Sequence, residues 1–363
     1  MKLLSAAQLG KITLRNRVIM APMTRSRADQ NGVVGELTAR YYTQRATAGL
    51  IITEATNIST DAIGSPFTPG IWSEAQVEGW ARVTGAVRAA GGAMVMQLWH
   101  TGRVGHSEVR GGRLPVAPSA VAIEGQRHFT PSGPKPYEVP CALTLSEIHA
   151  TLNDFEVAAR NAQAAGFDGV ELHGAFGYLP NQFLVSASNQ RTDEYGGSVE
   201  GRARFLLEAL QRLVSVWGEG RVGVRLSPTI AYNGMVDSDP RATFSYVIER
   251  LNDLPLAYLH LMRATPDAAR FPHWPQDAVA TFAPLFKGPV VLNGGFDRGS
   301  AEAALGAGVA QAVSFGVPFV SNPDLVHRFE LGAPLAAADQ GSFYGGGAEG
   351  YTDYPALTEA GGV

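Results

Sequence analysis

Short apolar runs, rich in β-branched residues, recur along the whole chain. They lack the alternation of apolar and polar positions that a half-exposed strand would show. Parallel strands that are covered on both faces of a sheet have this continuous apolar character. We therefore predict eight buried parallel strands, which begin near Arg17, Gly49, Ala93, Phe167, Arg221, Leu256, Pro289 and Ala312.

Segments with helical spacing separate these runs. One of them, 145–166, has Ser146 as a predicted N-cap and Gly166 as a predicted C-cap. Eight alternations of strand and helix are typical of a closed (β/α)₈ TIM barrel of the α/β class. The alternative is an open doubly wound sheet, but the chain has no Gly-rich dinucleotide fingerprint, which favours the barrel.

We expect one barrel domain over residues 1–363, because barrels of this class routinely exceed the usual domain length. The segment 100–144 is longer than the other connections and is rich in Gly, Pro and Ser. It follows the third predicted strand, so we expect an insertion at the catalytic face, either a lid or a small hairpin.

Composition and charge narrow the functional classes. The chain is 45% hydrophobic and 17% charged, with a net charge of −4 and a pI of about 6.1, unlike a nucleic-acid binder. No apolar run approaches the roughly 18 residues of a membrane helix, and the apolar start is too short for a signal peptide. The lone Cys141 excludes an intrachain disulfide. We expect a cytoplasmic, small-molecule-binding protein, monomeric or homodimeric, without a metal site.

Polar residues and glycines gather at the carboxyl ends of the predicted strands, where this fold places its active site. In chain order these ends carry Pro22, Met23, Thr24, Ala55, Gln97, Trp99, His173, Arg225, Asn293, Gly294, Gly295 and Gly316. Strand alternation points Trp99 to the same side as Gln97, so Trp99 is either a wall of the site or a buried aromatic of the barrel interior.

The last two strand ends predict a phosphate site. Glycines there let backbone N–H groups approach an anion, and a helix start adds favourable dipole charge. The alternative is that Gly294, Gly295 and Gly316 only allow the chain to turn.

Several long motifs then point to one family. MAPMTRSRA, QRATAGLIITEAT, MQLWHTGRVGH, NQRTDEYGGSVEGRARF, SNPDLV and SFYGGGAEGYTDYP are similar to the Old Yellow Enzyme family of FMN-dependent ene-reductases, over nearly the whole chain. The resemblance implies a (β/α)₈ barrel that binds FMN non-covalently and takes hydride from NADPH or NADH. It implies a ping-pong reduction of enones, enals, maleimides or nitroalkenes, with hydride passing through flavin N5.

By the same resemblance, Thr24 hydrogen-bonds flavin O4, Ala55 offers backbone near that edge, and Gln97 reads the pyrimidine edge. Arg225 corresponds to the arginine beside N1 and O2, where reduced flavin carries negative charge that a permanent cation stabilises. Thr24 could instead be a turn residue, and Arg225 could belong to an ion pair inside the barrel. The cofactor-binding set is predicted as Pro22, Met23, Thr24, Ala55, Gln97, Arg225, Asn293, Gly294, Gly295, Gly316 and Val317.

The stretch VELHGAFGYL supplies the expected catalytic residues. By resemblance, His173 hydrogen-bonds the substrate oxygen and Tyr178 protonates the α-carbon. The alternatives are a histidine that satisfies a neighbouring carbonyl and a tyrosine that only packs. The substrate is expected to contact Thr24, Trp99, His173, Phe176 and Tyr178.

Two positions depart from the family pattern. Phe176 stands where the family has His or Asn, and a phenyl ring donates no hydrogen bond. Val317 replaces the arginine of a Phe-Gly-Arg sequence, so a cationic phosphate partner is missing, for which Arg298 is one candidate substitute. These departures leave open a different substrate, such as a nitrate ester, a nitroaromatic or a dienoate, or a weakly active ligand-binding barrel.

Overall fold

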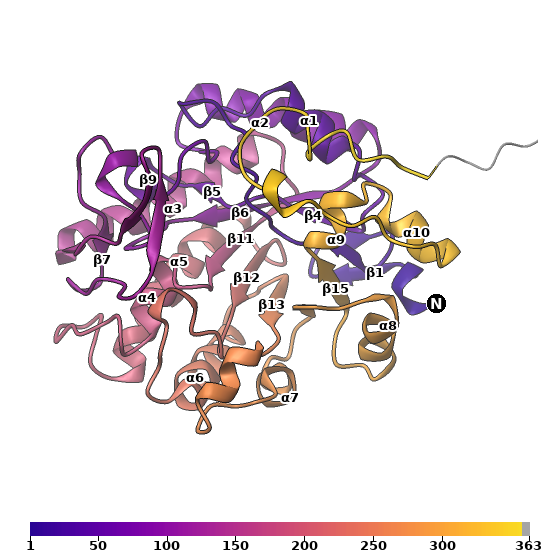
Figure 1. Cartoon of the computed structure of the whole chain (residues 1–363). Coiled ribbons are helices and arrows are strands. Elements are labelled where there is room, and N and C mark those ends of the chain that lie inside the picture. The colour runs from indigo at the N-terminus through magenta and orange to yellow at the C-terminus, as the bar shows by residue number, and fades with distance from the viewer. Residues whose placement is uncertain (358–363) are drawn as a thin grey trace, which may run out of the picture.

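A closed parallel barrel forms the centre of the protein, as a computed structural model describes it for residues 1–357 (Figure 1). Each strand pairs in parallel with its neighbours, and the last strand, β15, also pairs with the first, β3. The predicted (β/α)₈ barrel is therefore confirmed, because an open sheet would leave two edges unpaired. The eight strands are β3 (Val18–Met20), β4 (Leu50–Ile52), β6 (Met94–Trp99), β11 (Gly169–Gly174), β12 (Val222–Leu226), β13 (Tyr258–Met262), β14 (Val290–Asn293) and β15 (Ala312–Phe315).

Helices surround this barrel (Figure 1). They are α1 (Glu36–Thr43), α2 (Glu74–Ala89), α3 (Leu145–Ala164), α4 (Leu179–Leu184), α5 (Val199–Trp217), α6 (Pro240–Leu251), α7 (Ala278–Phe282), α8 (Arg298–Gly306), α9 (Val317–Ser321) and α10 (Leu325–Leu331). Among residues 1–357, none of the helices has the length and apolar character needed to cross a membrane. Strands that are buried on both faces explain the continuous apolar runs of the sequence.

Helix α3 begins earlier than the sequence predicted. Thr144 is its N-cap: the Thr144 hydroxyl accepts a hydrogen bond from the Glu147 N–H at 3.3 Å, and the Glu147 carboxylate accepts one from the Thr144 N–H at 2.7 Å. This capping box satisfies backbone donors that the predicted Ser146, already inside the helix, could not reach. Gly166 follows the helix end with a φ of +81°, which glycine adopts without strain.

The segment 100–144 carries an antiparallel hairpin of β8 (Arg127–Thr130) and β9 (Gly133–Pro136). Two short strands of the same segment, β7 (Val116–Ala117) and β10 (Cys141–Ala142), pair in parallel, and β10 lies just before α3. At the N-terminus, β1 (Ala7–Leu9) and β2 (Ile12–Leu14) form a further hairpin whose apolar side chains join the core cluster inside the barrel.

The C-terminal segment returns to the end of the first barrel strand. The Arg25 guanidinium donates to the Gly350 carbonyl at 2.7 Å, and the Gly345 N–H donates to the Arg25 carbonyl at 2.9 Å. Arg25 also lies over the stacked rings of Tyr41 and Tyr351, 5.1 Å from each centroid. These contacts hold the segment that carries Tyr344 beside the barrel mouth.

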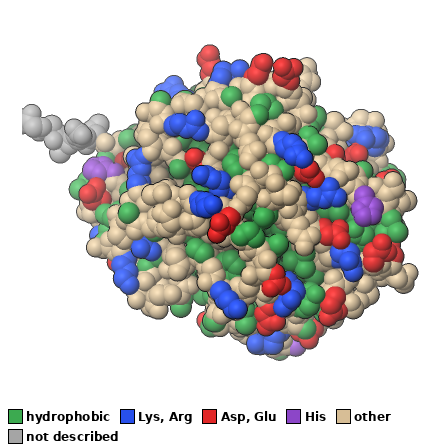
Figure 2. Space-filling model, turned by 180° about the vertical axis from the view of Figure 1, so that it is seen from behind, with side chains coloured by type: hydrophobic (Ala, Val, Ile, Leu, Met, Phe, Trp, Pro, Cys, Tyr) green, Lys and Arg blue, Asp and Glu red, His purple; other side chains and the backbone are tan. Residues whose placement is uncertain are grey.

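Basic and acidic side chains are interspersed over the face shown in Figure 2. That face has no stripe of positive charge of the kind that binds a polyanion such as DNA. The mixed pattern agrees with the slightly negative net charge of the whole chain, −4.

Candidate active site

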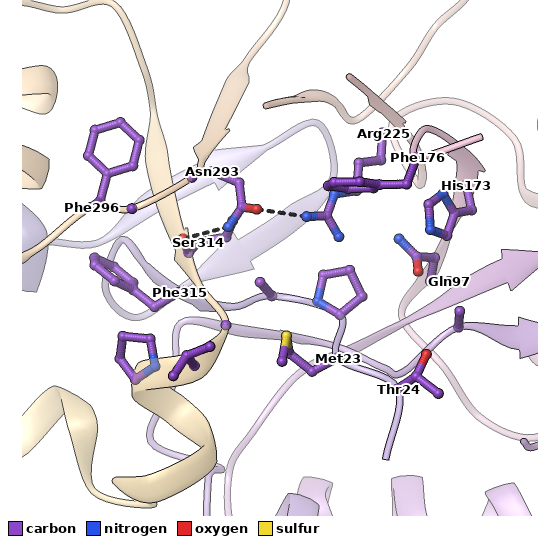
Figure 3. Close-up of a pocket in the computed structure, with 18 of the residues that line it drawn as sticks. Met23, Thr24, Gln97, His173, Phe176, Arg225, Asn293, Phe296, Ser314 and Phe315 are labelled. Carbon is purple, nitrogen blue, oxygen red and sulfur yellow. Dashed lines mark hydrogen bonds between the residues drawn. The ribbon is translucent and has the colours of Figure 1, made fainter. Parts of the chain in front are cut away.

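A cavity of about 600 Å³ opens at the carboxyl ends of the barrel strands (Figure 3). The sequence-predicted site residues come together there: all of them line this cavity except Trp99. Strand register explains the convergence, because Arg225 pairs with His173 on one side and with His260 on the other, and Asn293 pairs with Met262 and Ser314. Side chains from five strands therefore end at a similar height along the barrel axis.

Sequence reasoning missed eight lining residues, namely Ala21, Tyr232, Phe296, Asp297, Ser314, Phe315, Pro318 and Tyr344. For several of them the sequence contained a clue: Phe296 directly follows the glycine pair, and Tyr344 lies in a motif already used for the family resemblance. Tyr232 had none, because it belongs to an irregular loop after β12 that only the folded chain brings to the cavity.

His173 and Tyr178 meet at one side of the cavity. Their rings lie edge to face, with centroids 4.8 Å apart. Burial, and then the nearby Arg225 charge, lower the pKa of His173 well below its ordinary value, so the imidazole is neutral at pH 7. Burial raises the pKa of Tyr178 well above its ordinary value, so the phenol keeps its proton. His173 lines the cavity, and its Nδ1 is buried without a hydrogen-bond partner in the described chain.

Trp99 does not line the cavity, contrary to the prediction that it contacts the substrate. Its indole packs edge-on against the Tyr178 ring, with centroids 4.9 Å apart, and only 3% of the residue is exposed. Trp99 therefore supports Tyr178 from behind, which corresponds to the alternative of a buried aromatic.

Phe176 is held in a left-handed backbone conformation, with a φ of +56°. Its N–H donates to Ser227 Oγ at 2.9 Å, and its carbonyl accepts from Asn233 Nδ2 at 2.9 Å. These bonds offset a conformation that costs a bulky residue about 1 kcal/mol or more. The phenyl ring lies over the guanidinium of Arg225, at 5.1 Å, so an apolar face stands where a hydrogen-bond donor was expected (Figure 3).

Arg225 brings a positive charge to the same end of the cavity. Its guanidinium donates to Asn293 Oδ1 at 2.7 Å, and Asn293 in turn donates to the Ser314 carbonyl at 2.9 Å (Figure 3). Burial lowers the pKa of Arg225 to about 10, which still leaves it protonated at pH 7. Both observed partners of the guanidinium, Asn293 and Met262, are neutral, so the alternative of a direct ion pair inside the barrel is not observed in the described chain. Arg225 Nε is also buried without a partner.

Glycines form the opposite end of the cavity. Gly294 and Gly295 have φ values of +116° and +64°, and a Cβ atom on Gly316 would lie 2.9 Å from Met23 Sδ. At these glycines the backbone N–H groups can come close to a bound ligand, as binding of a phosphate group requires. A long cavity with a cationic end, an amide from Gln97 and a glycine end therefore fits the flat ring and phosphate of FMN.

Within the described residues 1–357, no basic side chain lines the glycine end of the cavity. Arg298, a candidate substitute for the missing arginine, turns elsewhere: its Nε contacts Met1 Sδ at 3.4 Å. The guanidinium of Arg263 lies closer, 4.6 Å from the centroid of the Phe296 ring, with Nη1 3.5 Å from the Gly294 carbonyl oxygen. Sequence reasoning did not single out Arg263.

Comparison with known proteins matches this chain to a protein family. The profile of the NADH:flavin oxidoreductase / NADH oxidase family matches residues 2–336. A Leishmania infantum protein named "Probable flavin mononucleotide-dependent alkene reductase" is 43% identical, over 96% of this chain and 95% of its own.

Solved structures agree with that match. Morphinone reductase in complex with tetrahydroNAD superposes with a TM-score of 0.93 at 46% identity, over 99% of this chain and 98% of that one. An old yellow enzyme homologue from Zymomonas mobilis has a TM-score of 0.93 at 45% identity, over 98% of this chain and 100% of that one.

These findings confirm the resemblance to Old Yellow Enzyme. They also confirm an enzyme, an oxidoreductase that depends on FMN and on a nicotinamide hydride donor. The chain belongs to the NADH:flavin oxidoreductase / NADH oxidase family.

Proposed function

We propose that this flavoprotein reduces activated C=C bonds, in enones, enals, maleimides or nitroalkenes, with NADPH or NADH. The observation that carries the proposal is the pair of His173 and Tyr178, a neutral imidazole and a protonated phenol 4.8 Å apart at one wall of the cavity. FMN, when bound, supplies two-electron hydride chemistry. The two side chains supply the hydrogen bond and the proton that reduction of such an alkene also needs.

His173 binds and polarises the oxygen of the activating group. A neutral imidazole carries one N–H, which donates to a carbonyl or nitro oxygen and strengthens as negative charge develops there. Burial keeps that N–H out of bulk water, where the hydrogen bond would be weaker. The lowered pKa of His173 means that the donor is the same species throughout the neutral pH range.

Tyr178 delivers the proton to the α-carbon. Its raised pKa keeps the hydroxyl protonated at neutral and mildly alkaline pH, so the acid form is always present. Trp99 packs edge-on against the ring and fixes its direction. We propose that four other polar lining residues, Thr24, Gln97, Arg225 and Asn293, bind the cofactor, together with backbone at Pro22, Met23, Ala55, Gly294, Gly295, Gly316 and Val317.

A second candidate activity is the reduction of a nitroaromatic or a nitrate ester. It is favoured by Phe176, whose ring offers an aromatic surface 6.2 Å from the His173 ring. A flat nitroaromatic could stack on that ring while His173 alone binds the nitro group. We also propose that the protein is cytoplasmic and works as a monomer or homodimer; the single cysteine supports a reducing compartment.

The test is an anaerobic spectrum followed by stopped-flow kinetics. A yellow protein that bleaches with NADPH and regains colour with an enone supports alkene reduction, and recovery only with a nitro compound supports the second candidate. Tyr178→Phe should slow reoxidation by an enone about 10²- to 10⁴-fold, the usual contribution of a general acid. Reduction by NADPH should stay near the wild-type rate. Equal slowing of both half-reactions would remove Tyr178 from the role of proton donor.

A further inference from the structure

A chain of buried polar side chains lies beneath Gln97. Glu171 is fully buried and pairs in register with Gln97 on the neighbouring strand. Gln97 Nε2 donates to one Glu171 oxygen at 2.7 Å, and His260 Nδ1 lies 2.8 Å from the other. His260 Nε2 lies 2.8 Å from the hydroxyl of Ser314. Of these residues, only Gln97 and Ser314 line the cavity, and the alkene chemistry uses neither Glu171 nor His260.

Contacts among these hydrogen-bonded side chains set the protonation states of Glu171 and His260. Burial alone would raise the pKa of Glu171, but His260, Arg225 and the Gln97 amide together lower it, so the carboxylate is ionised. Burial lowers the pKa of His260, although Glu171 partly opposes this, so the imidazole is neutral. A neutral His260 then donates its Nδ1–H to Glu171 and accepts from the Ser314 hydroxyl at Nε2.

An ionised carboxylate accepts hydrogen bonds and donates none. Gln97 must therefore present its NH₂ group to Glu171, which fixes the amide orientation that geometry alone leaves ambiguous. The Gln97 carbonyl oxygen and its second N–H are then free for the cavity. A donor and acceptor side by side match the imide edge of a flavin, which offers one N–H between two carbonyl oxygens.

We propose that Glu171 is a positioning residue for the cofactor, which holds Gln97 with its carbonyl oxygen toward the imide N–H of FMN. The inference rests on the FMN-dependent function. Besides holding Gln97, Glu171 acts on the flavin through its charge. Glu171 places a fixed negative charge beneath the end of the cavity where Arg225 places a positive one, and so opposes the extra negative charge of reduced flavin.

Two measurements on Glu171→Gln test the proposal without relying on turnover. Removing the charge should raise the flavin midpoint potential, with the equilibrium for reduction shifting about tenfold, or about 30 mV for a two-electron couple. A glutamine at 171 can donate or accept, so Gln97 loses its fixed orientation. Wild-type protein should bind FMN more tightly than FMN methylated at the imide nitrogen, and the variant should lose most of that preference.

Glu171→Asp is the matched second variant, in case the first does not fold. Aspartate keeps the charge but withdraws it from Gln97, so the potential should stay near wild type while the preference for unmethylated FMN falls. A folded, FMN-loaded Glu171→Gln protein with unchanged potential and unchanged preference would overturn the proposal, as would an aspartate variant that keeps the full preference. Wild-type protein that binds no FMN would instead contradict the FMN-dependent function itself.

Discussion

Phe176 combines two unusual features in one residue. Its φ of +56° lies in the left-handed region, where asparagine is tolerated far better than an aromatic residue, and its ring replaces a hydrogen-bond donor beside His173. The backbone bonds to Ser227 and Asn233 hold this conformation independently of the side chain. The backbone at position 176 therefore has a conformation that suits asparagine, but the phenyl side chain offers no hydrogen-bond donor beside His173.

Phe176→Asn should restore that donor. We expect turnover of a cyclic enone to rise at least about tenfold, since one donor to a developing oxyanion typically contributes about 10²- to 10³-fold. The thermal midpoint should not fall, because asparagine relieves backbone strain as the phenyl contacts are lost. Phe176→Leu is the control, with the same backbone conformation and no donor. Equal turnover by the two variants would show that His173 suffices.

At the scale of the elements, strand ends supply the parts of the site. The ends of β14 and β15 carry the glycines that we propose hold the phosphate, and among residues 1–357 no cationic side chain lines that end of the cavity. Arg263, immediately after β13, is the guanidinium that contacts this end through Phe296 and Gly294. Arg263, which follows the neighbouring strand β13, therefore brings a positive charge close to the glycines at the end of β14.

Arg263→Ala should weaken binding of FMN about tenfold or more and leave binding of riboflavin unchanged. The reason is that a hydrogen bond to a charged group contributes about 1.5 to 3 kcal/mol, and riboflavin has no phosphate to receive it. Fluorescence titration of apoprotein measures both affinities. Arg298→Ala, which removes a guanidinium that faces Met1, should change neither. A parallel loss for both flavins would mean that Arg263 only supports the fold.

Helix α3 offers a second test at this scale. Thr144→Ala removes the capping box and should lower the free energy of unfolding by about 1 kcal/mol. Ser146→Ala is the matched control and should have almost no effect, because Ser146 is exposed inside the helix and caps nothing. Denaturant titrations of both variants decide the point. A larger loss for Ser146→Ala would restore the cap that the sequence first suggested.

At the scale of the whole molecule, burial of neutral histidines makes stability depend on pH. Burial, and then the Arg110 charge, lower the pKa of His100 from 6.5 to about 3, and burial lowers those of His173 and His260. Below pH 6.5 the unfolded chain takes up protons that the folded chain refuses. Stability is therefore present above that pH and is lost progressively as pH falls toward 3.

The free energy of unfolding should thus decrease by up to about 1.4 kcal/mol per pH unit for each such histidine. Denaturant titrations between about pH 6.5 and 5 isolate this effect, because most carboxylates remain ionised there. His100→Asn should reduce the slope of the free energy of unfolding against pH by the contribution of one histidine. This holds even if the substitution lowers the free energy of unfolding at pH 7.5. An unchanged slope would mean that His100 is protonated in the folded protein.

Local features of the chain determined much of this picture. Continuous apolar runs predicted the strands because strands that are buried on both faces cannot alternate. Strand ends predicted Gln97, His173 and Arg225 because their height in a barrel follows from their place on a strand. Trp99 had the same periodicity as Gln97 yet lies behind Tyr178, since alternation gives the side of a strand but not which neighbour intervenes.

Only the tertiary structure decided the remainder. Tyr232 and Tyr344 reach the cavity on irregular segments, and contacts more than a hundred residues away in sequence, such as those of Arg25, place them. The ionised state of Glu171, and with it the orientation of Gln97, depends on groups from three other strands, namely Arg225 and the hydrogen-bonding side chains of His260 and Gln97. Local sequence carries propensity and periodicity, whereas burial and distances between charges exist only once the barrel has closed.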